Sequence, residues 1–236
     1  MGNVVIGRVD KIDELRTETA YVKAFQNQLA EHETVFLSPQ EFDKGNLKGE
    51  DIHLFIQPGL LDDVKGMSNV SVYFDLELYP FFQSIKEAML SAEKPQGVLR
   101  MRRKMLEEED ESIITGDVYV LSALLGEPAE AMVKRTKREV RPSHVILTVD
   151  FGGGTMAHLE YTFASEGEGI ELEWSGIKRI IEFDSGEMTP ITPDGYTALP
   201  LSYSVDAILS GSHSADEELR QSLNKYRTLL NGGGWR

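Results

Sequence analysis

The sequence predicts a mixed α/β protein with a wound parallel sheet in its first part and longer, alternating strands in its second. In the first part, short runs of β-branched residues alternate with helical stretches, which is the pattern of parallel βα units. From Ser143 to Asp184, apolar and polar residues alternate and glycines separate the runs, which indicates strands that bury one face. We expect this stretch to form a β-meander that needs another element to cover it.

The elements of the first part follow from hydrophobic period and from start and stop signals. Val4–Val9 fits a buried strand, and the polar stretch from Ile12 to about Glu31 fits a helix. Ser38 can cap a helical turn at Pro39–Asp43. Further strands are predicted at Thr34–Leu37, Ile52–Ile56 and Val70–Phe74, and a helix from Pro80 to about Ser91 with an apolar stripe of Phe81, Phe82, Ile85 and Met89.

The second part begins with a longer strand. Gly97–Met105 alternates so that Leu99, Met101, Arg103 and Met105 share one face. A helix from Ile114 to about Leu125 is expected to end at Gly126, because glycine followed by proline is a common helix stop. The remaining predictions are a strand at Glu130–Arg138, hairpins at Gly152–Gly154 and at Gly167 with Gly169, a strand at Ile177–Phe183, helical pieces at Ser202–Leu209 and Ala215–Leu230, and a frayed tail.

The composition narrows the class of partner and the compartment. The chain has 236 residues, and its net charge of -15 disfavours both nucleic acid and anionic membranes as partners. It has no cysteine, so disulfides, thiol nucleophiles and thiolate metal sites are excluded. The first residues lack the features of a signal peptide, and no apolar run reaches the length of a membrane span. We therefore expect a cytoplasmic protein.

The histidines offer one arrangement that could bind a metal. His144 and His158 fall on the two strands of one predicted hairpin, and a carboxylate such as Glu160 or Asp150 could complete a site. Exposed histidines on strands are far commoner than ligands, so no metal is predicted.

Three segments in order resemble a known family. They are GVLRMRRK at Gly97–Lys104, ALLGEP at Ala123–Pro128 and IELEWSGIKRIIEFD at Ile170–Asp184. Together they resemble the second domain of the Gfo/Idh/MocA oxidoreductases, the glucose-fructose oxidoreductase and inositol dehydrogenase type. The resemblance implies a shortened or degenerate Rossmann-like domain at residues 1–94, an open, mostly antiparallel sheet with helices on one face at 95–230, and a flexible tail at 231–236. It also implies a homodimer formed through that second sheet.

The cofactor turn of the family is not matched. The family binds NAD or NADP at a GxGxxG turn after the first strand, where glycines let the backbone approach the pyrophosphate. Here the first strand continues as GRVDKID, with a single glycine. Gly167 and Gly169 lie between two strands, so a phosphate role there is not expected. No cofactor-binding residue is predicted, and the stretch before Gly97 is short for a full dinucleotide domain.

The proton-transfer residues of the family are also depleted. The resemblance places an EKP motif after the strand at 70–74, where this chain reads Asp75-Leu76-Glu77, without the lysine. The literal Glu93-Lys94-Pro95 has the wrong context and is expected to be a loop. The segment that matches the HDID motif of the family reads GDVY at 116–119, so the histidine is replaced by glycine. Asp117 and Tyr119 remain the candidate catalytic residues, although we favour a helix-dipole role for Asp117 and a packing role for Tyr119.

Two functions from different classes follow. In the first, the chain is a non-catalytic or divergent relative of the oxidoreductases, a dimeric binding or regulatory protein with no cofactor and with a small molecule as a possible ligand. In the second, it is an active NAD(P)-dependent oxidoreductase on a small polyol or sugar. We favour the first, because the glycine turn, the lysine and the histidine are missing together.

Overall fold

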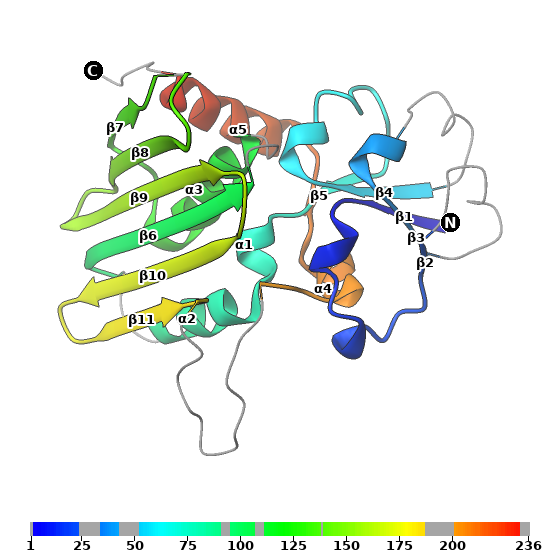
Figure 1. The fold of residues 1–236 in the computed structure, drawn as a ribbon, viewed down its shortest axis with the longest axis horizontal. Coiled ribbons are helices and arrows are strands. Elements are labelled where there is room, and N and C mark those ends of the chain that lie inside the picture. The colour runs from blue at the N-terminus through cyan, green and yellow to red at the C-terminus, as the bar shows by residue number, and fades with distance from the viewer. Residues whose placement is uncertain are drawn as a thin grey trace. The chain divides into compact units, whose positions relative to one another are not determined.

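A computed structural model describes residues 2–23, 34–42, 52–90, 95–106, 111–137, 139–186 and 201–231 (Figure 1). Contacts within the chain divide it into two compact units, each built around its own sheet. The first unit is Met1–Pro80 with Ser202–Ser222, and the second is Phe81–Leu201 with Leu223–Arg236. The domain boundary predicted between residues 94 and 95 stays a prediction. The contacts separate the two units between Pro80 and Phe81.

The first unit contains a six-stranded sheet in the order β12-β5-β4-β1-β3-β2. Every described pairing in it is parallel except that of β12 with β5, so the predicted wound parallel sheet is confirmed. Strand β1 pairs with β3 on one side and with β4 on the other, which is the topology of a switch point. The strands are β1 Gly2–Ile6, β2 Val22–Lys23, β3 Thr34–Leu37, β4 Ile52–Ile56, β5 Val70–Val72 and β12 His213–Ser214.

The predicted helix from Ile12 to about Glu31 is wrong over the described residues 12–23. The chain forms short 3-10 turns at Val9–Lys11 and Glu14–Arg16, and then strand β2. The backbone N–H groups of Glu18 and Thr19, which a helix would use, instead donate to the carboxylate of Asp206 at 2.7 and 3.1 Å. A distant side chain therefore competes successfully with helix formation, which single-residue preferences do not anticipate. Residues 24–31 lie outside the described residues.

The second unit contains a six-stranded sheet in the order β11-β10-β6-β9-β8-β7. Its pairings are antiparallel except for β6 with β9, so the predicted open and mostly antiparallel sheet is confirmed. The strands are β6 Gly97–Leu106, β7 Glu130–Arg135, β8 Ser143–Asp150, β9 Thr155–Ala164, β10 Gly169–Gly176 and β11 Ile180–Asp184.

The predicted meander is wrong at one point, because β9 and β10 do not form a hairpin. Strand β6 lies between them, and it pairs with β9 in parallel from Gly97 to Leu106 and with β10 in antiparallel. The Gly167 and Gly169 segment therefore crosses over the end of β6 (Figure 1). Alternation specifies which face each side chain occupies but not which strand lies next to it.

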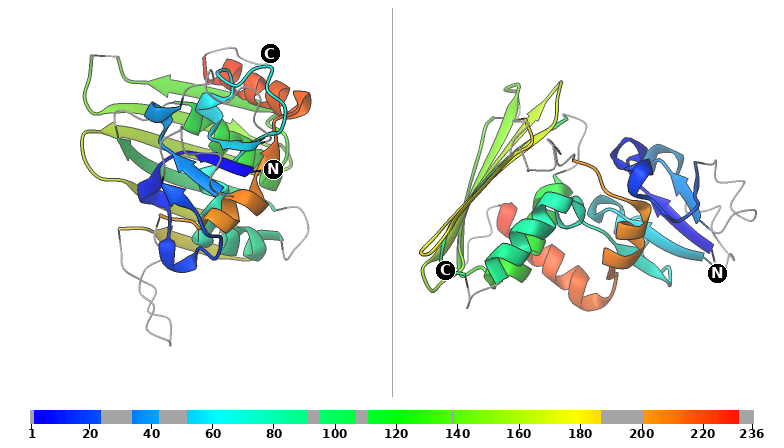
Figure 2. Two further views of the ribbon diagram at one scale, coloured as in Figure 1. Left: turned by 90° about the vertical axis from the view of Figure 1, so that its right-hand side faces the viewer. Right: turned by 90° about the horizontal axis from the view of Figure 1, so that it is seen from below.

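Helices cover one face of the second sheet. Figure 2 shows α2 and α3 on that side, where the strands place their buried residues. Phe81, Phe82, Ile85 and Met89 of α2 are buried as predicted, and α3 ends at Gly126, whose φ is +104°. No described helix has the length and apolar character needed to cross a membrane. The α-helices are α1 Asp75–Leu78, α2 Pro80–Leu90, α3 Ser112–Leu125, α4 Val205–Gly211 and α5 Glu217–Leu230.

Candidate functional site

Open parallel sheets bind their ligands at the carboxyl ends of their strands. At this edge of the first sheet, the side chain of a tyrosine lies beside the end of β1. Gly7 follows β1, and a Cβ atom built on it would lie 1.8 Å from the hydroxyl oxygen of Tyr73. Tyr73 is fully buried, and its hydroxyl donates to the carbonyl oxygen of Ile6 at 3.0 Å. Burial, with the charge of Asp75 adding to it, raises the pKa of Tyr73 well above its usual range. The space beside Gly7 is thus occupied by a neutral side chain of the protein itself.

A second element from far along the chain closes the same edge. The backbone N–H of Tyr203 donates to the carbonyl of Lys11 at 3.0 Å, and the N–H of Asp13 donates to the carbonyl of Tyr203 at 2.9 Å. Ile12 and Tyr203 form a parallel bridge between these bonds. The residues after β1 are therefore committed to backbone pairing at the point where a dinucleotide-binding fold begins a helix.

Asp75, at the first position of the segment that replaces EKP, is held by two donors. Its carboxylate accepts hydrogen bonds from Tyr203 at 2.9 Å and from Gln57 at 3.1 Å. Leu76 follows and is fully buried. Glu77, the third residue, lies 2.7 Å from Nε2 of His213 on β12. The sequence did not reveal this carboxylate–imidazole pair, because 136 residues separate its members.

These residues do not fit a dinucleotide. Pyrophosphate recognition needs close backbone approach at glycines and a helix N-terminus directed at the charge. The positions of the second and third glycines are Val9 and Ile12, and the first glycine faces the Tyr73 hydroxyl. Between β1 and β2 the described residues form only 3-10 turns of three residues each, which present no extended helix N-terminus.

The candidate catalytic residues of the second unit lie on α3. Asp117 is buried and accepts two hydrogen bonds from one guanidinium nitrogen of Arg103, at 2.7 and 2.9 Å. Burial, together with the Asp117 charge, raises the pKa of the nearby Tyr161 well above its usual range. Tyr119 is half-buried. Asp117 is thus engaged in an internal ion pair between α3 and β6.

Arg103 is the residue of this group that the sequence could have identified. The alternation of β6 places it among Leu99, Met101 and Met105, on the face that the helices cover. A cation on the buried, apolar face of a strand destabilises the folded protein unless a buried anion faces it. Its position therefore indicates a carboxylate in the covering helix, which the structure shows to be Asp117.

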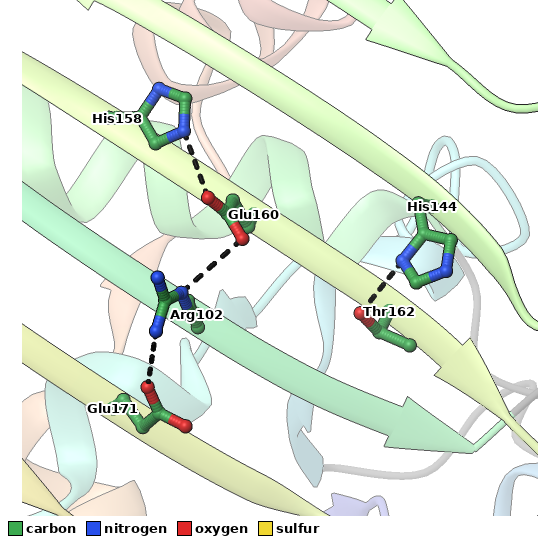
Figure 3. A network of polar contacts seen from close by, with 6 residues as sticks. All are labelled: Arg102, His144, His158, Glu160, Thr162 and Glu171. Atoms are coloured by element: carbon green, nitrogen blue, oxygen red, sulfur yellow. Dashed lines mark hydrogen bonds and ion pairs between the residues drawn. The ribbon is translucent and has the colours of Figure 1, made fainter.

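The opposite face of the second sheet carries a polar network (Figure 3), and no described helix of the second unit packs on it. Arg102 of β6 lies 3.3 Å from Glu160 of β9 and 3.1 Å from Glu171 of β10. Nε2 of His158 lies 3.0 Å from the other oxygen of Glu160, so four side chains form a line across three strands. We call this surface the open face. Its groove, of about 480 Å³, is lined by the side chains of Arg100, Arg102, His158, Glu160, Glu171, Glu173, Glu182 and Asp184 together with Met101, Leu172 and Phe183.

Hydrogen bonds and neighbouring charges shift the pKa of two groups on the open face. The hydrogen bond that Arg102 donates to Glu171, with the charge of Glu160, raises the pKa of Arg102. A hydrogen bond from Ser175, with the charge of Arg100, lowers the pKa of Glu173. Both shifts favour the charged forms of Arg102 and Glu173.

His144 and His158, the two histidines considered above as a conceivable metal pair, have separate partners. His144 bonds to Thr162 at 3.0 Å, and His158 bonds to Glu160 and to Thr148. Figure 3 shows the two imidazoles apart along the sheet. Across the described residues, no group of three histidine, aspartate or glutamate side chains is placed to hold a metal ion.

Comparison with known proteins shows the fold. No family model and no curated protein matches the chain. Among solved structures, a probable dehydrogenase from Thermotoga maritima is 14% identical with a TM-score of 0.60, over 99% of this chain and 97% of that one. GenD2 from gentamicin A biosynthesis, in complex with NAD, is 12% identical with a TM-score of 0.58, over 100% and 96% of the two chains. A myo-inositol dehydrogenase from Corynebacterium glutamicum is 12% identical with a TM-score of 0.53, over 99% and 90%. The resemblance to inositol dehydrogenase-type proteins is therefore confirmed for the fold.

Proposed function

We propose that this chain is a non-catalytic relative of the Gfo/Idh/MocA oxidoreductases that acts as a dimeric binding or regulatory protein. The observation that carries the proposal is the closed carboxyl edge of the first sheet. The Tyr73 hydroxyl lies where a Cβ on Gly7 would be, and Tyr203 pairs with the backbone on both sides of Ile12. Both contacts are internal to the first unit and occupy the region that a pyrophosphate would need.

The proton-transfer positions support the same proposal. A hydride transfer from an alcohol needs a base within hydrogen-bond reach of the hydroxyl. The position of the family lysine is Leu76, which is fully buried and has no titratable group. The position of the family histidine is Gly116, and the adjacent Asp117 is tied to Arg103. Each of the three positions therefore has a structural role or no acid–base chemistry.

The open face is the part that we assign to a partner. Four large apolar side chains on it are exposed: Met132 at 61%, Ile146 at 36%, Met156 at 42% and Ile180 at 68%. Large apolar groups interleaved with paired charges are typical of association surfaces. We propose a second copy of the chain as the partner, with a small-molecule ligand as a further possibility and the cytoplasm as the compartment.

One observation favours the alternative, an active NAD(P)-dependent oxidoreductase on a small polyol or sugar. The His213–Glu77 pair lies at the carboxyl end of β5, and an imidazole hydrogen-bonded to a carboxylate is a competent general base. GenD2, one of the structural neighbours, was solved in complex with NAD. This alternative requires Tyr73 and Tyr203 to leave their buried positions before a nucleotide could enter.

Binding of the reduced nucleotides separates the two functions. Thermal unfolding and equilibrium dialysis with NADH and NADPH are expected to show neither stabilisation nor retention. A ligand present at 100 times its dissociation constant would stabilise the folded chain by about 2.7 kcal/mol. A matched variant, His213→Gln, removes the candidate base of the alternative. If the natural chain turns over a polyol or sugar and His213→Gln does not, the chain is an oxidoreductase and the alternative holds.

A further inference from the structure

One basic stretch of the chain has no part in the sites described above. Residues 134–141 contain five basic residues and one acidic residue, in a chain whose net charge is -15. They form the end of β7 and the connection to β8. Cations on an edge strand protect a sheet from pairing with other chains, and the exposed Lys134 fits that role. Arg135 does not fit it, because its side chain lies on the side of the sheet that the helices cover.

The register and two hydrogen bonds fix the position of Arg135. It pairs with Val145 of β8, which is buried. Its guanidinium donates to the carboxylate of Glu111, just before α3, at 2.5 Å and to the carbonyl oxygen of Leu230, the last residue of α5, at 3.1 Å. The end of α5 therefore lies beside β7 (Figure 1). These bonds orient the guanidinium and use two of its five N–H donors.

A cavity of about 690 Å³ lies beside Arg135, within the second unit. Sites for small molecules have volumes of about 300–1,000 Å³ and combine an apolar lining with a few polar groups. The apolar side chains here are Val133, Val145 and Leu230. The cavity therefore has both the size and the apolar wall of a small-molecule site.

The hydrogen-bonding groups of the cavity come mainly from the connection between β7 and β8. Arg141 supplies a second guanidinium, and Thr136 and Ser143 supply hydroxyl groups. The Thr136 hydroxyl oxygen accepts from the backbone N–H of His144 at 2.9 Å, and a hydroxyl that accepts in this way can still donate its own proton. Donors thus gather at one side of the apolar wall.

The charge of this cavity is opposite to that of the whole chain. Its lining has the guanidinium groups of Arg135 and Arg141 against the single carboxylate of Glu111. The groove on the open face, by contrast, has two guanidinium groups against five carboxylates. A concave site lined by one sign of charge concentrates ligands of the opposite sign. A long polyanion would be repelled by the rest of this acidic chain, whereas a small anion meets only the cavity.

The charge balance also indicates the head group of the ligand. An excess of one positive charge matches a carboxylate, which carries one negative charge, better than a phosphate monoester, which carries about -1.5 to -2 at pH 7. A guanidinium can also bind a carboxylate through two parallel N–H···O bonds.

We propose that the cavity between the β7–β8 connection and the end of α5 binds a small carboxylic acid with an apolar body. The carboxylate bonds to Arg141 and Arg135, and the apolar body lies against Val133, Val145 and Leu230. The inference rests on the proposed binding role, for which it names a site and a ligand class.

Benzoate and benzamide are matched probes for this site, because they share a ring and differ in charge. NMR titration of the isotope-labelled chain is expected to shift the amide signals of Thr136, Ser143 and Asn231 saturably with benzoate, and much less with benzamide. Arg141→Gln should weaken benzoate binding about tenfold, as expected for the loss of one charged hydrogen bond. Lys137→Gln removes a cation of the same connection that does not line the cavity, so it should weaken binding by less than about twofold.

Several results would overturn the proposal. Equal affinities for benzoate and benzamide would show that the carboxylate is not recognised, and equal losses in Arg141→Gln and Lys137→Gln would show unspecific attraction of anions. Tighter binding of phenyl phosphate than of benzoate would overturn the assigned head group, and the absence of saturable shifts with benzoate would overturn the site. The experiments with NADH and NADPH decide the non-catalytic assignment separately, because they test the first unit with a different class of ligand.

Discussion

The hydroxyl oxygen of Tyr73 lies 1.8 Å from the position that a Cβ atom on Gly7 would take. Gly7→Ala is therefore expected to destabilise the first unit by about 1–3 kcal/mol, the usual cost of overpacking a buried site. Tyr73→Phe removes the hydroxyl, and the nearest ring carbon then lies 3.2 Å from the new methyl group. The double variant should be more stable than the sum of the two single effects predicts.

Urea unfolding of the four proteins in this cycle measures the coupling. We expect an interaction energy of about 1 kcal/mol or more between the two sites, since residues in direct contact do not behave additively. Additive effects would show that the hydroxyl and the glycine do not share this space.

Asp206 holds the segment after β1 to the start of α4. Its carboxylate accepts from the backbone N–H groups of Glu18 and Thr19, and the Thr19 hydroxyl bond is the main cause that lowers the pKa of Asp206. A carboxylate with a lowered folded pKa stabilises the protein above its unfolded pKa, and this contribution is lost as the pH falls through the folded value. Asp206→Asn should lower the free energy of unfolding at neutral pH by about 1 kcal/mol.

The pH dependence provides the internal check for Asp206. The difference between the natural chain and Asp206→Asn should shrink as the pH falls below the reference value of 3.8. Carboxyl titration by NMR should place the Asp206 midpoint below that value. A midpoint at or above it would contradict the hydrogen bonds described for this side chain.

Removing one member of the buried Arg103–Asp117 pair should destabilise the protein strongly, whereas replacing both members with apolar residues should destabilise it much less. Asp117→Leu leaves a guanidinium in the covered face without its carboxylate, and a loss of about 3–5 kcal/mol is expected. The double variant Arg103→Met with Asp117→Leu removes both charges, so it should be markedly more stable than Asp117→Leu alone. Chemical denaturation tests this, and equal losses in both variants would mean that packing of α3, rather than the charge pair, dominates.

The paired charges of the open face should contribute little to the fold of one copy. Arg102 is 65% exposed, and exposed ion pairs contribute about 0–1 kcal/mol. Arg102→Glu should therefore change thermal stability slightly while weakening self-association. Lys86→Glu on α2, away from the open face, is a matched charge reversal. Sedimentation of both variants at two concentrations measures self-association. Equal dissociation of Arg102→Glu and Lys86→Glu would contradict this prediction.

Several elements follow from the sequence because local signals determine them. The strands Thr34–Leu37 and Ile52–Ile56 have the predicted bounds, and α3 ends at the predicted glycine. Along β8 and β9 the buried residues are those that alternation assigns to one face. Each of these depends on residues that are close together in the chain.

The remainder depends on distant contacts. The insertion of β6 between β9 and β10 needs the register of strands more than fifty residues apart, which periodicity does not contain. The turn after β1 is shaped by Tyr203 and Asp206 from the far end of the chain. The sequence showed that the glycine turn was incomplete, but not that Tyr73 would fill the space beside Gly7.

Calorimetric titration of the natural chain with NADH and NADPH tests the central claim most directly. Since Tyr73 and Tyr203 occupy the edge where pyrophosphate would bind, we predict no saturable heat and no change in unfolding temperature. Saturable binding of either nucleotide that Gly7→Ala weakens would contradict the closed edge. It would support the alternative, an active NAD(P)-dependent oxidoreductase.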